Sequence, residues 1–143
     1  MIKLNDYSYD EIKIGDTFEF NRKLSDDDVR TFANLTQDKN PLHCDEEYAK
    51  NTKFRKRIVH GLLAGSLFST LVGMLCPGRK NLYVSQSLNF KNPIPIGSKV
   101  TVKGIIKNKI DSLKMIEITT QILVKNQIMI EGEAKVLVME NEG

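Results

Sequence analysis

The uncharged segment IVHGLLAGSLFSTLVGMLC, residues 58–76, dominates the predicted fold because it contains no aspartate, glutamate, lysine or arginine. Two rows with four-residue spacing run along it, one of leucines and one of small residues: Leu63, Leu67, Leu71, Leu75; Gly61, Gly65, Ser69, Gly73. This spacing predicts a helix from Gly61 that ends at Pro77-Gly78. Because apolar residues lie on nearly every side of this helix, we expect it to be buried on most sides. The row of small residues should let the backbone of another segment approach the helix closely.

The same segment approaches the length of a membrane-spanning helix. It also holds His60, three glycines and the hydroxyls of Ser66, Ser69 and Thr70, which make it too polar for a membrane insertion signal. We therefore expect a buried central helix in a soluble protein, with no membrane association.

Shorter helices are predicted before this segment. Ser25 precedes three aspartates, with Asp28 at the capping-box position, so a helix should begin there and end before Asp38. Residues 45–50 should form a further helical turn or two. Ahead of both, residues 12–20 read as a glycine turn at Gly15 followed by a short alternating strand.

After residue 80 the pattern changes to strands rich in valine, isoleucine and threonine. The predicted strands are 83–91, 99–107, 115–124 and 128–138, with a rigid connection at 92–97 and hairpin turns at 108–113 and 125–127. Residues 1–143 should thus form a single α+β domain, in which about five antiparallel strands pack against one long helix.

Composition excludes several classes of function. Hydrophobic residues at 41% and charged residues at 27% are typical of a soluble globular protein. The net charge is only +3, and the basic residues are scattered apart from two short clusters, so we expect no nucleic-acid partner. The basic clusters 53–57 and 79–80 either meet phosphates of a substrate or are solvated surface.

Cys44 and Cys76 show neither a CxxC motif nor zinc-type spacing, so we expect reduced thiols and no metal. Residues 1–6 lack the apolar stretch of a signal peptide. Both features favour a cytoplasmic location.

Chemistry is concentrated between residues 38 and 61. Asp38 and His43 flank Asn40-Pro41, and because a residue before proline is extended, we expect a stiff loop that is not helical. Its two side chains could converge on one water molecule. Gly61, at the start of the helix, could offer its N–H to an oxyanion. The alternative is a hydrated loop with an incidental aspartate and histidine.

Residues 32–45, FANLTQDKNPLHCD, resemble the hydratase-2 motif of the MaoC-like, (R)-specific enoyl-CoA hydratases. The resemblance continues through RIVHG, residues 57–61, and QSLNF, residues 86–90, and covers almost the whole chain. Two departures are Gln37, where many members have glycine, and Cys44, where an aliphatic residue is common.

This resemblance implies a hot-dog fold, a homodimer with sheets joined edge to edge, and (R)-specific, reversible hydration of trans-2-enoyl thioesters in fatty acid metabolism. It implies Asp38 and His43 as the catalytic pair, Gly61 as the N–H donor to the thioester carbonyl, Asn40 as a positioning residue, and Ser69 near the site. The substrate would be an acyl-CoA or acyl-carrier-protein thioester, and no cofactor is required. On this interpretation His60 lies outside the catalytic pair.

Three other functions remain open. Hot-dog thioesterases and acyl-carrier-protein dehydratases often carry a catalytic acid on the central helix, whereas residues 58–76 contain none. A non-catalytic module that binds acyl thioesters would need neither Asp38 nor His43. A fourth function, with a Cys44–His43 nucleophile, fails on geometry, because adjacent side chains on an extended loop tend to point apart.

Overall fold

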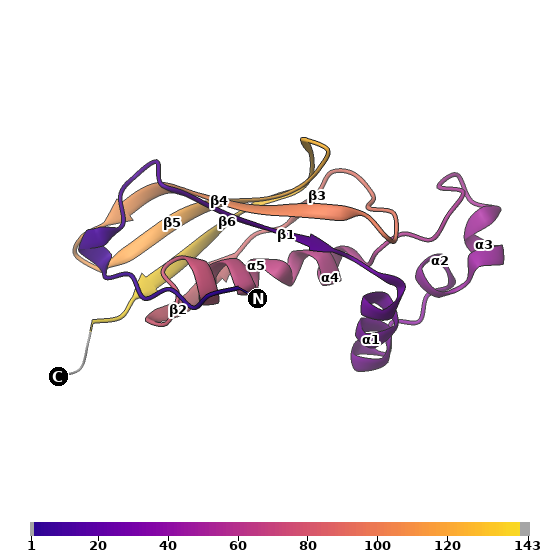
Figure 1. The fold of residues 1–143 in the computed structure, drawn as a ribbon, viewed down its shortest axis with the longest axis horizontal. Helices are drawn as coiled ribbons and strands as arrows, with labels where there is room; N and C mark the ends of the chain where they lie inside the picture. The colour runs from indigo at the N-terminus through magenta and orange to yellow at the C-terminus, as the bar shows by residue number, and fades with distance from the viewer. Residues whose placement is uncertain (1, 141–143) are drawn as a thin grey trace.

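The computed structural model describes residues 2–140. The helical elements are η1 (Tyr9–Glu11), α1 (Asp26–Thr36), α2 (Pro41–Cys44), α3 (Glu46–Lys50), α4 (Gly61–Gly65), α5 (Leu67–Thr70) and η2 (Leu71–Leu75). The strands are β1 (Thr17–Lys23), β2 (Asn81–Gln86), β3 (Asn89–Phe90), β4 (Lys99–Ile110), β5 (Met115–Val124) and β6 (Gln127–Val138). One curved sheet lies over the segment α4–α5–η2, and α1, α2 and α3 gather at the end where α4 begins (Figure 1).

The sheet is antiparallel and has six strands in the order β1-β4-β5-β6-β2, with β3 also paired to β6. Strands β4 and β5 alternate buried and partly buried side chains over most of their length, and β6 alternates from Ala134 onward, as expected for a sheet with one covered face. The α+β prediction is confirmed, and the hairpin turns fall close to the predicted positions. The β4–β5 turn is tighter than predicted, because β4 continues to Ile110.

The predicted strand 83–91 is divided into β2 and β3. At the break, the N–H of Glu133 on β6 donates to the hydroxyl of Ser87, at 2.9 Å, instead of to a backbone carbonyl. The Ser87 hydroxyl thus replaces a backbone acceptor in the hydrogen-bond ladder, and the strand is interrupted at this point. Leu88, the next residue, packs against the core. Alternation alone does not reveal such a substitution.

The central helix packs on the sheet through one face. Ala64, Leu67, Phe68, Leu71 and Val72 are buried, with the three- and four-residue spacing of an amphipathic helix. The opposite face is open: Leu62 is 62% exposed, and Ser66 and Ser69 are exposed. The expectation of burial on most sides was therefore wrong for a single chain, which supplies only one covering layer.

The helix is also interrupted. The hydroxyl of Ser66 donates to the carbonyl of Leu63 at 2.5 Å, directly after Gly65, and a Gly-Ser pair with such a bond bends a helix. The last turn widens to a π-helix, with the Cys76 N–H on the Leu71 carbonyl at 3.0 Å. Within residues 2–140, no helix is long and apolar enough to cross a membrane.

Helices α1 and α3 form where predicted. Ser25 caps α1: its hydroxyl accepts from the Asp28 N–H at 3.2 Å, and the Asp28 carboxylate accepts from the Ser25 N–H at 2.9 Å. This reciprocal pair of hydrogen bonds fixes the start of α1. It thereby also fixes the direction of the helix, which brings Phe32 and Thr36 to a cavity near the start of α4.

Candidate active site

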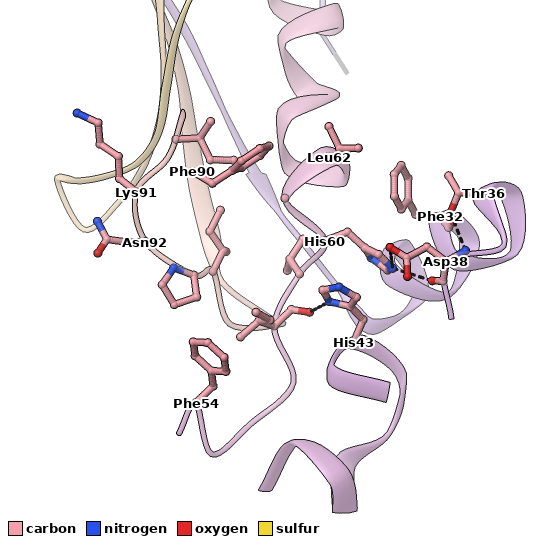
Figure 2. Close-up of a pocket in the computed structure, with 16 residues that line it drawn as sticks. Phe32, Thr36, Asp38, His43, Phe54, His60, Leu62, Phe90, Lys91 and Asn92 are labelled. Carbon is pink, nitrogen blue, oxygen red and sulfur yellow. Dashed lines mark hydrogen bonds and ion pairs between the residues drawn. The ribbon is translucent and has the colours of Figure 1, made fainter. Parts of the chain in front are cut away.

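A cavity of about 520 Å³ opens where α1, α2 and the start of α4 meet the sheet. Aromatic and aliphatic side chains form most of its wall. Thr36, Asp38, His43 and His60 gather at one side, and Lys91 and Asn92 lie at the opposite side (Figure 2). The lining residues are Phe32, Thr36, Asp38, His43, Phe54, Ile58, Val59, His60, Gly61, Leu62, Phe90, Lys91, Asn92, Pro93, Ile94 and Ile130. Apolar walls with a few convergent polar groups are typical of a ligand site.

Asp38 follows the left-handed residue that ends α1. Gln37 has φ of 68°, a conformation that glycine adopts without cost, which explains why glycine suits this position. The Asp38 N–H donates to the Thr36 hydroxyl at 3.2 Å, and the Asn40 N–H donates to the Asp38 carboxylate at 3.3 Å. These two bonds hold a side chain that is 50% exposed at the cavity.

His43 lies on a helical turn, not on the extended loop that we predicted. Asn40 is extended, with ψ of 132°, but Pro41 then takes the first position of α2, where its missing N–H is not needed. The Asn40 side chain caps this turn by accepting from the Leu42 N–H at 3.0 Å. Asn40 therefore shapes the chain between Asp38 and His43 without lining the cavity itself.

The tautomer of His43 follows from its partner. Its Nδ1 lies 2.7 Å from the carbonyl oxygen of Ile58, and a carbonyl can only accept, so Nδ1 carries the hydrogen. In a neutral ring with this tautomer, Nε2 carries a lone pair and can accept a hydrogen bond. Nitrogen or oxygen atoms of Asp38, His43 and His60 lie within 4.8 Å of one another. Because two hydrogen bonds of about 2.8 Å span up to about 5.6 Å, one water fits between such groups.

His60 also belongs to this cluster, and that it lies outside the catalytic pair stays a prediction. The imidazole is 2% exposed and stacks on His43, with ring centroids 3.9 Å apart and planes 27° apart. Its Nε2 lies 3.0 Å from the backbone carbonyl oxygen of Asp38 and 4.0 Å from the carboxylate of that residue. On its other side it packs against the Phe32 ring, 4.9 Å away.

The two imidazoles are poorly arranged to hold a metal ion. Ring nitrogens bind metals through lone pairs that lie in the ring plane, and in stacked rings these lone pairs run side by side. The near-parallel planes of His43 and His60 therefore suit proton transfer and packing better than shared coordination.

Burial lowers the pKa of His60 below its usual 6.5, and the neighbouring His43 lowers it further. The unfolded chain therefore binds a proton that the folded chain does not, and folding stability should fall as pH drops below about 6.5. We expect a dependence of at most about 1.4 kcal/mol per pH unit from this group. Urea unfolding between pH 7 and pH 5 should show it, with a shallower dependence in His60→Gln. Equal slopes in both proteins would contradict this account.

Arg57 ties the helices around the cavity together. Its buried guanidinium is ion-paired with Asp26 of α1, lies 3.8 Å from Glu46 of α3, and donates to the His43 carbonyl at 2.7 Å. The bond from Arg57 lowers the pKa of Asp26. Arg57 is thus unavailable to substrate phosphates, which corrects its place in the predicted basic cluster.

Replacing Arg57 by methionine should cost about 2 kcal/mol of unfolding free energy, because charge-assisted hydrogen bonds are lost while both carboxylates stay solvated. Urea unfolding at one fixed protein concentration measures this. Arg79→Met serves as the control, because Arg79 is exposed and lies 3.8 Å from Asp6, far from α1. If the two variants lose equal stability, Arg57 does not hold these helices together.

The other predicted residues divide between the cavity and the open surface. Gly61 lines the cavity at the first position of α4, where its N–H has no acceptor within the helix. A Cβ atom there would lie 2.7 Å from the Phe90 ring, so at Gly61 the small row admits a side chain and not a second backbone. Ser69 is exposed on α5 and does not line the cavity of one chain.

Sequence reasoning missed the apolar wall. Phe32 and Phe54 reach the cavity from α1 and from the loop after α3 (Figure 2). Ile94, in the segment before β4, and Ile130, on β6, also line it. These residues are far apart along the chain, and only the fold brings them together. The one available signal was Phe54, an aromatic residue within a basic run.

A sheet that curves over a central helix defines a hot-dog fold, and an aspartate and a histidine lie together at its apolar cavity. The chain belongs to the MaoC-like family, because residues 11–128 match the MaoC like domain.

Relatives of known name support this assignment. The chain is 37% identical to an (R)-specific enoyl-CoA hydratase of Rhodospirillum rubrum, over 91% of this chain and 90% of that protein. It is 33% identical to a mitochondrial 3-hydroxyacyl-[acyl-carrier-protein] dehydratase of Arabidopsis thaliana, over 86% of this chain and 75% of that protein. The solved structure of the R-hydratase PhaJ1 from Pseudomonas aeruginosa superimposes with a TM-score of 0.92, at 28% identity, over 96% of this chain and 89% of that one.

Proposed function

We propose that this protein is an enzyme, a hydro-lyase that hydrates trans-2-enoyl thioesters reversibly to (R)-3-hydroxyacyl thioesters. The observation that carries the proposal is a ring nitrogen of His43 within 4.8 Å of an Asp38 carboxylate oxygen at the edge of an apolar cavity, while Nδ1 of that ring is bonded to the Ile58 carbonyl. The similarity to an (R)-specific enoyl-CoA hydratase supports the substrate class and the stereochemistry.

Asp38, His43 and Gly61 have distinct roles in the proposed reaction. Asp38 accepts one hydrogen of a water molecule and orients it, while His43 Nε2 accepts the other proton as the oxygen attacks C3. The electron pair of the double bond moves onto the thioester oxygen, which the N–H of Gly61 stabilises. The proton then passes from His43 to C2 on the same face, so that one water supplies both the hydroxyl group and the proton.

A spectrophotometric assay tests this proposal. Hydration removes the conjugated double bond of crotonyl-CoA and of longer enoyl-CoAs, and chiral chromatography identifies the product. We expect loss of the enoyl absorbance and a product of R configuration. Absence of hydration across the chain lengths, or an S product, would refute the proposed activity.

A second candidate substrate is the acyl-carrier-protein thioester. It is favoured by the exposed Lys53, Arg55 and Lys56 beside Phe54, which lines the cavity, and by the similarity to the plant dehydratase. Arg79 and Lys80 contact Asp6 beyond the far end of the central helix, so they do not belong to this surface. Comparing kcat/KM for the same enoyl chain on coenzyme A and on carrier protein distinguishes the two carriers.

We also propose a homodimer joined through the β2 edge. Strand β2 ends the sheet, and Leu82 and Val84 on it are 53% and 50% exposed. Leu62 and Phe90 are also more than half exposed, on α4 and β3. An unpaired strand edge beside apolar side chains favours pairing with a second copy.

Light scattering at micromolar concentration should give twice the chain mass. Val84→Lys should shift the protein toward half that value, because it places a charge on the proposed joining edge. Leu113→Lys is the matched control: Leu113 is 55% exposed but lies in the β4–β5 turn. A monomeric wild-type protein, or equal effects of both substitutions, would exclude this interface.

We infer a cytoplasmic location from the two free thiols of Cys44 and Cys76, which are typical of a reducing compartment.

A further inference from the structure

His60 contacts both members of the proposed catalytic pair, although neither its sequence position nor the proposed chemistry requires it. Its Nε2 meets the Asp38 carbonyl at 3.0 Å, and its ring lies flat against His43 at 3.9 Å. Phe32 covers the opposite side of the ring. His60 is 2% exposed, and Phe32, His43 and Asp38 lie around its ring (Figure 2).

The hydrogen-bond partners fix the protonation state of this ring. Since the Asp38 carbonyl can only accept, Nε2 of His60 must carry hydrogen. Its Nδ1 is buried without a partner among residues 2–140, so a hydrogen there would have no acceptor. His60 is therefore neutral and protonated on Nε2, whereas His43 is protonated on Nδ1 through its bond to Ile58. The two stacked imidazoles are opposite tautomers.

We propose that His60 is a positioning residue for the hydration reaction: its Nε2–H holds the Asp38 backbone, so that the Asp38 carboxylate and the bare Nε2 of His43 stay one water apart. This inference rests on the proposed function. His60 itself takes up no proton in the reaction, because its bare nitrogen points into the protein interior.

A purely structural role would require only an aromatic ring that fills the space between Phe32 and His43. A positioning role also requires a donor at the place of Nε2, because the Asp38 loop is held there through its carbonyl. The side chains of phenylalanine and glutamine separate these requirements. Phenylalanine keeps the stack and has no donor, whereas the amide nitrogen of glutamine reaches the Nε2 position without a ring.

The first test is spectroscopic and needs no substrate. The chain has two histidines, so long-range ¹H–¹⁵N spectra of ¹⁵N-histidine-labelled protein resolve both rings, and His60→Gln assigns them. At neutral pH we expect His60 to be protonated on Nε2 alone and His43 on Nδ1 alone. A His60 ring protonated on Nδ1, or on both nitrogens, would overturn the proposal.

The second test compares kinetics. His60→Gln should keep kcat within about fivefold of wild type, while His60→Phe should lose at least about tenfold in kcat with KM unchanged, because small displacements of reacting groups are costly. Equal kcat values in the two variants would overturn the positioning role. If His60→Phe does not fold, the tautomers of the wild-type protein still decide the question.

Failure of the proposed function can be recognised separately. A wild-type protein that hydrates no enoyl thioester refutes the activity alone, and hydrogen exchange then reports on the loop. The Asn40 N–H donates to the Asp38 carboxylate, so it should exchange faster in His60→Phe than in His60→Gln. Equal exchange at Asn40 in the two variants would overturn the positioning of Asp38.

Discussion

Asp38→Asn and His43→Gln should each lower kcat for enoyl-CoA hydration by at least about 10²-fold, with little change in KM. Both replacements keep the size of the side chain and remove a group that acts on the water. The apolar cavity that binds the acyl chain is left intact, so substrate affinity should be preserved. Steady-state kinetics with crotonyl-CoA measures both parameters.

The double variant gives the more specific result. If Asp38 and His43 act on one water, the first replacement already abolishes most of the catalysis that depends on that water. The second replacement should then add little, and the combined loss in kcat should be far smaller than the product of the single losses. Multiplicative losses would indicate two independent roles. If His60→Gln were inactive while His43→Gln stayed active, the roles of the two histidines would have to be exchanged.

Local signals in the sequence predicted the elements that frame this site. The capping box at Ser25, the change to period two after residue 80, and the proline and glycine at 77–78 all act on neighbouring residues, and the structure confirms each. The resemblance of residues 32–45 to a known motif placed Asp38 and His43 at one site, where the structure also brings them.

Features that depend on contacts between distant residues escaped prediction. The stack of His43 on His60 joins two residues that are separated along the chain by α3 and the loop after it. No rule of sequence spacing predicts that contact. The Ser87 hydroxyl enters the sheet ladder only because Glu133 lies opposite to it. One face of the central helix is open because the single sheet of one chain covers only the other face. The pattern of apolar residues along the helix does not show how many layers will cover it.

Gly61→Pro should abolish turnover, because it removes the N–H that would stabilise the thioester oxygen; losing such a donor typically costs about 10²–10³-fold in kcat. The backbone can accept this change. Proline is tolerated at the first position of a helix, and His60 before it has φ of −56° and ψ of 130°, which suits a residue preceding proline.

The Phe90 ring determines which control is needed. Any Cβ atom at residue 61 would lie 2.7 Å from that ring, so Gly61→Pro combines a steric change with loss of the N–H. Gly61→Ala introduces the same Cβ atom and keeps the N–H. Phe90 is 53% exposed, so Phe90→Ala provides a background in which both substitutions fit. Within that background, only proline removes the donor.

We therefore expect Gly61→Ala to stay within about tenfold of its parent and Gly61→Pro to lose at least about 10²-fold in kcat, in both backgrounds. Circular dichroism and urea unfolding establish that each variant is folded. A folded Gly61→Pro protein that keeps more than about a tenth of its parent's rate would assign the oxyanion to another donor. Equal losses for alanine and proline that disappear together in the Phe90→Ala background would show that the ring, and not the N–H, limits the rate.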